Sequence, residues 1–294
     1  MSNLDKEGNK NTGWNAEVSS LLNNIYRCAD KSSWYDSVAL AYDRTRPRYP
    51  EAILSSMQQK IELQPGKSVL EIGAGPAIIT PELAKFGADI VSLEPSKSAV
   101  AIAKDKCAAY SNVEIVNTTF EDWNLNTRRF DVVVAATSFH WITPEVRYIK
   151  TAEALKDNGY LVLLWNTPPQ PSYEVHQSIQ NIYQTHAPEL SKYEGHQQHQ
   201  ENIGKIGQAV VDSGYFQDLT SDCVASRRHR LIVTVRYSVE NYLALLSTLS
   251  PYIRLSAQQR EILFVQLQQK LREFTSDRDL DLSYLSLLQT FRKS

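Results

Sequence analysis

Short apolar segments alternate with longer amphipathic segments from residue 68 to residue 166. This alternation is typical of a sheet of parallel strands with a helix after each strand. The fourth apolar segment, FDVVVAA, has no polar face, as expected for a strand covered on both sides. Gly87 lies where the C-terminal glycine of a helix belongs. The expected strands are Ser68–Ile72, Asp89–Leu93, Val113–Val116, Phe130–Ala136 and Tyr160–Trp165.

The regular alternation ends after residue 166. Residues 167–171 hold three prolines and predict a loop. Ser256 and Gln259 have the spacing of a capping box at the start of a helix. The elements expected in this part are helices over about 172–186, 201–213, 238–249 and 256–274, a strand over 223–235 and a last strand over 280–291.

The composition is that of an ordinary globular protein, with 42% hydrophobic and 22% charged residues. The net charge of −2 provides no strong positive field, so we expect no nucleic-acid partner. No apolar run approaches 18 residues, and the polar N-terminus lacks an apolar signal core. The three cysteines lie far apart and form neither a disulfide framework nor a metal-type pair. A cytoplasmic protein without a membrane partner is therefore expected.

The turn after the first expected strand, EIGAGPA, contains the most informative motif. Glycines at 73 and 75 let the backbone turn tightly and approach a ligand closely. A following helix N-terminus would point amide groups at the same place. The dinucleotide fingerprint requires a third glycine at position 78, which is Ile78. A nicotinamide-dependent oxidoreductase is therefore disfavoured, although a nicotinamide titration would be needed to exclude it.

Two carboxylates end the first two strands. Glu71 lies two residues before the first glycine, where it would disfavour a pyrophosphate and favour a cationic ligand. S-Adenosylmethionine fits this preference, because it carries a sulfonium and an ammonium but no phosphate. Glu94 closes the second strand, where a carboxylate can accept hydrogen bonds from both ribose hydroxyls. Because neighbouring parallel strands end at the same edge, Glu71 and Glu94 should lie side by side.

On these motifs the chain resembles the class I S-adenosylmethionine-dependent methyltransferases, and within them the methyltransferase type 11 group. It has a general likeness to trans-aconitate methyltransferases. The resemblance covers about residues 34–166 and rests on VLEIGAGPA, VSLEP, FEDW, FDVVVAATSFHW and YDSVALAYDRTRPRYP. It implies an α/β, Rossmann-like fold with a seven-stranded, mostly parallel sheet, an antiparallel last strand and a helical cap.

The same resemblance implies a division of the chain and a set of roles. Residues 1–33 would be a polar tail with a short helix, and 34–166 the cofactor-binding core with an N-terminal lid. Residues 167–222 would be a helical insertion of the cap, and 223–294 the last two strands with a cap insertion at 238–274. The implied cofactor-binding residues are Arg46, Glu71, Gly73, Ala74, Gly75, Glu94, Pro95, Ser96, Thr119, Phe120, Glu121, Ala136 and Thr137. The implied acceptor pocket is Tyr35, Tyr49, His140, Trp141 and Trp165, with Tyr42 in the lid.

Two positions depart from the family pattern. Ala77 stands in place of a third glycine, and Thr119 stands where an acidic residue commonly precedes the adenine-flanking pair. A threonine hydroxyl can still bond the adenine amine, but it carries no charge.

Other polar clusters have simpler interpretations. His140 is a candidate general base, but a structural histidine is equally consistent with the sequence. His196 and His199 lack the further ligands of a metal site, so no metal is expected. The run Arg227–Arg230 lacks interleaved aromatics and is expected to be a solvated strand edge.

The sequence thus predicts a methyltransferase that uses S-adenosylmethionine, yields S-adenosylhomocysteine and acts on a small molecule through an O, N or C nucleophile, for example a carboxylate. Aromatic residues of the expected cap, Tyr35, Tyr49, Tyr173 and Tyr183, favour a partly apolar acceptor. A noncatalytic S-adenosylmethionine-binding protein and a methyltransferase of a macromolecule remain alternatives.

Overall fold

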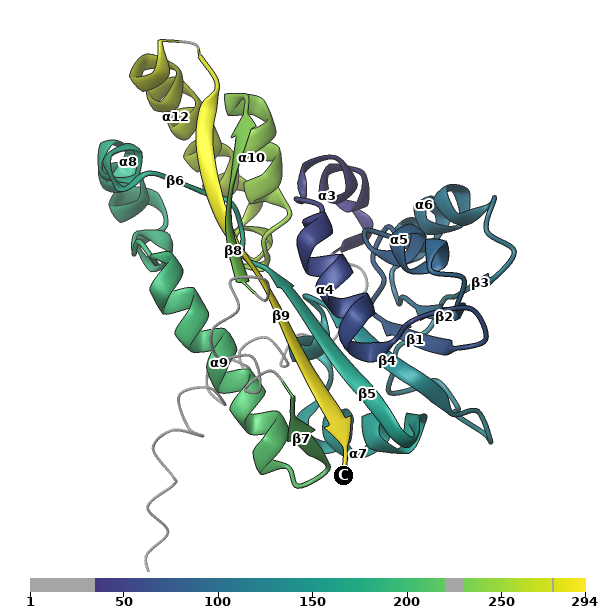
Figure 1. Ribbon diagram of the computed structural model, residues 1–294. Helices are drawn as coiled ribbons and strands as arrows, with labels where there is room; N and C mark the ends of the chain where they lie inside the picture. Colours follow the sequence, from purple (N-terminus) through teal and green to yellow (C-terminus); the bar gives the residue numbers. More distant parts are fainter. Residues whose placement is uncertain (1–34, 220–229, 277) are drawn as a thin grey trace, which may run out of the picture. The chain divides into compact units, whose positions relative to one another are not determined.

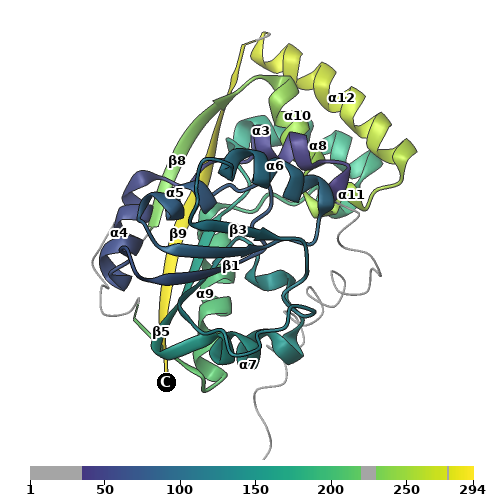
Figure 2. The ribbon, with the colours of Figure 1, turned by 90° about the vertical axis from the view of Figure 1, so that its right-hand side faces the viewer.

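A single mixed sheet of nine strands organises the described part of the chain (Figures 1 and 2). The computed structural model describes residues 35–219, 230–276 and 278–294. The short helix expected within residues 1–33 and residues 227–229 of the basic run lie outside the described residues. The main path of the sheet is β3-β2-β1-β4-β5-β9-β6, and β7 and β8 also pair with β9.

The five parallel strands follow the sequence prediction closely. Four of them have the expected bounds: β1 (Ser68–Ile72), β2 (Asp89–Leu93), β3 (Val113–Val116) and β4 (Phe130–Ala136). β5 (Leu155–Asn166) begins five residues earlier than expected, because Asn158 takes a left-handed φ of 62° and the chain pairs again beyond it. β1 lies between β2 and β4, so the carboxyl ends of these strands meet at one edge.

The antiparallel half of the sheet differs from the expectation of seven strands. β9 (Leu280–Lys293) has 14 residues and pairs with four strands, with β6 and β8 mainly along its first half and with β5 and β7 along its second half. Two of these partners, β6 (Gln170–Pro171) and β7 (Phe216–Asp218), are too short to leave a periodic signal. A strand was expected over 223–235. Within the described residues it is present as β8 (Arg230–Tyr237), which ends two residues later than expected.

Helices cover both faces of the parallel strands. Val133 and Ala135 pack into one apolar cluster and Val132 and Val134 into another, so β4 is buried on both sides as its composition predicts. The helices are α3 (Ala39–Thr45), α4 (Glu51–Ile61), α5 (Thr80–Lys85), α6 (Lys97–Cys107), α7 (Pro144–Ala154), α8 (Tyr173–His186), α9 (His196–Asp212), α10 (Val239–Ser247), α11 (Ser250–Ile253) and α12 (Ala257–Thr275), with 3₁₀ turns at Phe139–Trp141 and Pro188–Leu190. The capping box of Ser256 and Gln259 is present at the start of α12.

A third apolar cluster joins α8, α10 and α12. α10 packs against α3, and α3 also contacts α6 (Figure 2). The short helix α3 is therefore held between the third cluster and the parallel part of the sheet. None of the helices in the described ranges combines the length and the apolarity needed to cross a membrane.

Candidate cofactor and acceptor site

The turn after β1 adopts the backbone conformation that its glycines predict. Gly73 and Gly75 have φ of 69° and 57°, in the left-handed region. The amides of Gly73 and Ala74 both donate to the carbonyl of Leu93 at the end of β2, at 2.8 and 3.0 Å. Ala77 also has a left-handed φ of 56°, so glycine would suit this position better. The turn is thus tied to the end of the neighbouring strand.

The two glycines differ in their surroundings, and this predicts different effects of alanine. A Cβ on Gly73 would lie 2.7 Å from Cβ of Ser138, whereas a Cβ on Gly75 would find only Tyr42, at 4.0 Å. We expect Gly73→Ala to lower the free energy of unfolding by about 2 kcal/mol, the range of overpacked cores. Gly75→Ala serves as the matched variant, because both residues have positive φ, and it should cost about 1 kcal/mol. Urea denaturation measures both, and equal losses would contradict the predicted clash.

Glu94 lies directly beside this turn. One carboxylate oxygen accepts from the amide of Gly75 and the other from the amide of Ser96, each at 2.8 Å. Only 7% of Glu94 is exposed, and burial raises the pKa of its carboxyl, against the effect of these two amides. Ser96 caps α6, and its hydroxyl donates to Asp36, which also accepts from the amide of Ser98. The carboxylate is therefore fixed in place by backbone on both sides.

Glu71 is buried under the same edge. Its Oε2 accepts from the hydroxyls of Thr80 and Ser92, at 2.8 and 2.6 Å, and its Oε1 has no hydrogen-bond partner among the described residues. Burial raises the pKa of Glu71 to about 7, opposed by these two hydroxyls and reinforced by the negative charge of Glu94. The two glutamates thus influence each other electrostatically, in line with the expected neighbouring strand ends.

A narrow cavity of about 40 Å³ lies in front of the glycine turn. Its walls come from the turn, from the ends of β4 and β5 and from the segment that follows α3. The lining residues are Tyr42, Arg46, Pro47, Tyr49, Gly73, Ala74, Gly75, Ile78, Ile79, Ala136, Thr137 and Asn166. The residues that the sequence predicts for the methionine side of the cofactor and for the lid therefore share one cavity.

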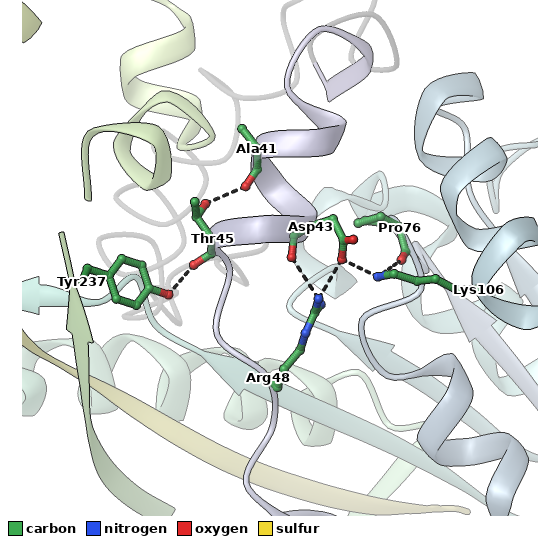
Figure 3. A network of polar contacts seen from close by, with 7 residues as sticks. All are labelled: Ala41, Asp43, Thr45, Arg48, Pro76, Lys106 and Tyr237. Atoms are coloured by element: carbon green, nitrogen blue, oxygen red, sulfur yellow. Dashed lines mark hydrogen bonds and ion pairs between the residues drawn. The ribbon is translucent and has the colours of Figure 1, made fainter. Parts of the chain in front are cut away.

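The lid segment is anchored at several points (Figure 3). Asp43 accepts from Arg48 and from Lys106 of α6, and Lys106 also donates to the carbonyl of Pro76 in the glycine-rich loop. The hydroxyl of Tyr237 on β8 donates to the carbonyl of Thr45. Arg46 stacks on Tyr42 and donates to the hydroxyl and carbonyl of Thr248, at 2.9 and 3.0 Å. These contacts tie residues 43–48 to α6, to β8 and to the end of α10.

The ion pair of Lys106 with Asp43 offers a test of lid closure. Lys106→Met keeps the length of the side chain but removes the charge that holds Asp43 and Pro76. Partly exposed pairs contribute about 1 kcal/mol or less, so we expect the release of a bound adenosyl ligand to become about threefold to fivefold faster. Lys104→Met, an exposed position on the same helix, is the control. Stopped-flow kinetics measure the rate of S-adenosylhomocysteine release. Equal rates in the two variants would show that the ion pair of Lys106 with Asp43 does not retain the ligand.

The ends of β4 and β5 form the floor of the cavity. Thr137 has a left-handed φ of 56°, which is rare for a β-branched residue and is found mainly at functional sites. Its Oγ1 lies 2.7 Å from the Tyr49 hydroxyl and accepts from the amide of Asn166 at 3.1 Å. Burial raises the pKa of Tyr49. Asn166 was not predicted from the sequence, since an asparagine at a strand end has no distinctive pattern.

His140 lies on the 3₁₀ turn after β4. Its ring packs against Trp141 and Trp165, with centroids 5.1 and 5.7 Å away. Burial, followed by the charges of Arg147 and Arg46, lowers the pKa of His140 to about 3. Imidazole is therefore neutral at physiological pH and a weak proton acceptor, which favours the structural interpretation of His140. Tyr35 contacts Trp141 and Tyr42 edge-on, so it links the 3₁₀ turn to α3.

The residues expected around adenine lie after β3. Phe120 is buried in the core with the Lys150 ammonium over its ring, and Glu121 accepts from the amide of Thr143 at 2.9 Å. The Thr119 hydroxyl donates to Asp122 and accepts from the Asp122 amide. The Thr119 hydroxyl therefore already has a donor and an acceptor within residues 119–122. Pro95 precedes Ser96 at the end of β2, on the same edge of the sheet.

Several aromatic predictions fall elsewhere. Trp165 is 5% exposed, packs in the core and donates to Gln289, and it does not line the described cavity. Tyr183 is buried in the third cluster against Tyr252, and Tyr173 is exposed. Within the described ranges, no group of histidines, cysteines and carboxylates could hold a metal ion. His196 instead contacts the hydroxyl of Ser283 at 2.9 Å.

Comparison with known proteins relates the chain to methyltransferases. Residues 69–159 match the model of the methyltransferase domain. An uncharacterised methyltransferase of Mycobacterium bovis is 29% identical over 138 residues, which are 47% of this chain and 54% of the relative. Residues 69–159 are a methyltransferase domain. An uncharacterised methyltransferase of Schizosaccharomyces pombe is 22% identical over 242 residues, or 82% of this chain and 88% of the relative. The chain spans about half the length of the first curated relatives that it matches.

Solved structures confirm the fold around the methyltransferase domain. A proposed type II methyltransferase from Anaeromyxobacter dehalogenans has a TM-score of 0.58 at 18% identity, covering 84% of this chain and 97% of that one. The [4+2]-cyclase SpnF has a TM-score of 0.51 at 15% identity, covering 89% and 94%. The expected Rossmann-like class I methyltransferase fold is confirmed. The likeness to SpnF also means that this fold alone does not establish methyl transfer.

Proposed function

We propose that the protein is an S-adenosylmethionine-dependent methyltransferase that acts on a small molecule. The observation that carries the proposal is the position of Glu94. A carboxylate held by the amides of Gly75 and Ser96 stands between the glycine turn and the end of β2. Neighbouring strand ends of this kind hold ribose hydroxyls in open parallel sheets. The methyltransferase domain of residues 69–159 makes S-adenosylmethionine the fitting ligand.

The residues present fit this cofactor. Beside Gly75 only Tyr42, at 4.0 Å, stands near the place of a side chain, so the methionine portion can approach the backbone of Gly73–Gly75. Buried Glu71 favours a nearby cation, and Ala136 and Thr137 border the same cavity. The cavity of about 40 Å³ is smaller than the several hundred Å³ typical of ligand sites. The lid, including Tyr35, Tyr42, Arg46 and Tyr49, therefore has to shift when the cofactor enters.

The chemistry would be an in-line displacement. S-Adenosylmethionine supplies an electrophilic methyl group; the acceptor's lone pair bonds to its carbon, and the electrons of the broken carbon–sulfur bond stay on sulfur. The chain contributes alignment and exclusion of water rather than a strong base, since the His140 imidazole is neutral and weakly basic. The third cluster, with α8, α10 and α12, would form the cap that limits the acceptor to a small molecule.

Calorimetric titration with S-adenosylmethionine, S-adenosylhomocysteine and, as a control, NADH tests the proposal. Micromolar binding of both adenosyl ligands and no binding of NADH are expected. A ligand at 100 times its dissociation constant should stabilise the fold by about 2.7 kcal/mol, which thermal denaturation detects. Tight NADH binding would favour an oxidoreductase. Binding of the adenosyl ligands without turnover of any acceptor would favour a noncatalytic protein.

A further inference from the structure

Asn166 ends β5, and the two polar atoms of its side chain, Nδ2 and Oδ1, have different surroundings. Its Nδ2 donates to the carbonyls of Pro47 and Arg48, at 3.1 and 3.3 Å. Carbonyls only accept hydrogen bonds, so the amide nitrogen has to face them and the side chain cannot be flipped. The orientation of Oδ1 is therefore fixed by the lid segment.

The other atom, Oδ1, is an acceptor without a donor. Asn166 is 7% exposed and lines the cavity, and its Oδ1 has no hydrogen-bond partner among the described residues. Buried acceptors are nearly always satisfied, so an orphan at a cavity marks a place where a ligand supplies the donor. The neighbouring hydroxyls of Tyr49 and Thr137 are bonded to each other, and the Arg46 guanidinium is bonded to Thr248.

The strand order indicates which ligand reaches this atom. Glu94 ends β2, the glycine turn follows β1, Thr137 follows β4, and Asn166 ends β5, in the spatial order β2-β1-β4-β5. With the proposed ribose site at Glu94 and the methionine site at Gly73–Gly75, the cofactor extends from β2 across β1 toward β4. Asn166 lies one strand beyond, on the side from which an acceptor approaches.

We propose that Asn166 Oδ1 accepts a hydrogen bond from the nucleophile of the methyl acceptor, and that this acceptor is an amine or a hydroxyl compound rather than a carboxylate. This inference rests on the proposed function. An N–H or O–H group satisfies the orphan oxygen and leaves a lone pair free to attack the methyl carbon. The attacking atom gains the methyl group and then releases its proton to solvent. An ionised carboxylate carries only lone pairs, and Oδ1 would repel it.

A matched pair of variants isolates the role of Oδ1. Asn166→Leu keeps the approximate volume but removes both the orphan oxygen and the bonds to the lid. Tyr284→Phe removes a different donor to the Arg48 carbonyl, which the Tyr284 hydroxyl reaches at 3.0 Å, and leaves Oδ1 intact. A loosened lid segment is therefore common to both variants, whereas loss of the acceptor atom is specific to the first.

The experiment supplies S-adenosylmethionine with a deuterated methyl group and a deproteinised cell extract as the source of acceptors. We expect the label in N-methyl or O-methyl products that resist mild alkali. Labelling at saturating cofactor should fall at least tenfold in Asn166→Leu and less than twofold in Tyr284→Phe, with cofactor affinity changed by about the same factor in both. Methyl esters, which alkali cleaves, or C-methylated products would overturn the inference, and so would weaker cofactor binding in Asn166→Leu alone. Failure of the wild type to bind S-adenosylmethionine would contradict the proposed function instead, and binding without any labelled product would overturn the inference.

Discussion

Replacing Glu94 with glutamine should weaken the binding of S-adenosylmethionine about 100-fold or more while the protein stays folded. The carboxylate accepts from Gly75 and Ser96 with one lone pair of each oxygen, which leaves lone pairs for two ribose hydroxyls. Hydrogen bonds to a charged group contribute about 1.5–3 kcal/mol each, and about 1.4 kcal/mol corresponds to a factor of ten in affinity. A glutamine also places an NH₂ group against one of the two backbone amides, so the side chain cannot keep both anchors.

Isothermal calorimetry of wild type and variant with S-adenosylhomocysteine measures this effect. Glu114→Gln provides the control, because Glu114 lies on neighbouring β3, is exposed and pairs with Arg128 at 3.3 Å. Circular dichroism and urea denaturation verify that both variants are folded. An unchanged dissociation constant for the Glu94 variant would mean that the ribose site lies elsewhere.

The sequence predicted the parallel half of the molecule almost to the residue, because these strands are short, apolar and buried on both faces. Glu71, Gly73 and Glu94 could be placed with them, since each is fixed by its position at a strand end. β6 and β7 escaped prediction, because two or three residues carry no periodicity and their pairing is decided by the long partner β9.

The long-range contacts of Arg46 and the orphan acceptor of Asn166 escaped prediction for a different reason. The partners of Arg46 and Asn166 are separated from them by 202 and about 119 positions in the chain, and backbone carbonyls are among them. No local pattern reports such contacts. The resemblance places Trp165 in the acceptor pocket, whereas strand alternation turns this side chain into the core and Asn166 lines the cavity. The trans-aconitate-like subtype stays a prediction, and the proposed role of Asn166 argues against a carboxylate acceptor.

Glu71→Gln should make the ligand-free protein more stable at pH 8 by about 3 kcal/mol and leave its stability at pH 4 nearly unchanged. Burial raises the pKa of Glu71 from 4.5 in the unfolded chain to about 7 in the folded protein. Below pH 4.5 the carboxyl is largely protonated in both states. Between pH 4.5 and 7 the folded state holds a proton that the unfolded state has lost, so stability falls as pH rises. Above pH 7 both states are ionised and the free energy of unfolding falls no further. The difference of roughly 2.5 between the pKa values in the folded and unfolded states corresponds to about 3 kcal/mol.

Glutamine removes this dependence, because it is neutral at every pH and its carbonyl can still accept from Thr80 and Ser92. Urea denaturation of both proteins at pH 4 and pH 8 gives the four free energies of unfolding, and their double difference isolates Glu71 from other titrating groups. Saturation with S-adenosylmethionine should stabilise the wild type more than the variant at pH 8, since a bound cation favours the ionised carboxylate. A gain from glutamine that is equal at both pH values would show that Glu71 ionises normally in the folded protein, and its proposed part in attracting a cationic ligand would then have to be abandoned.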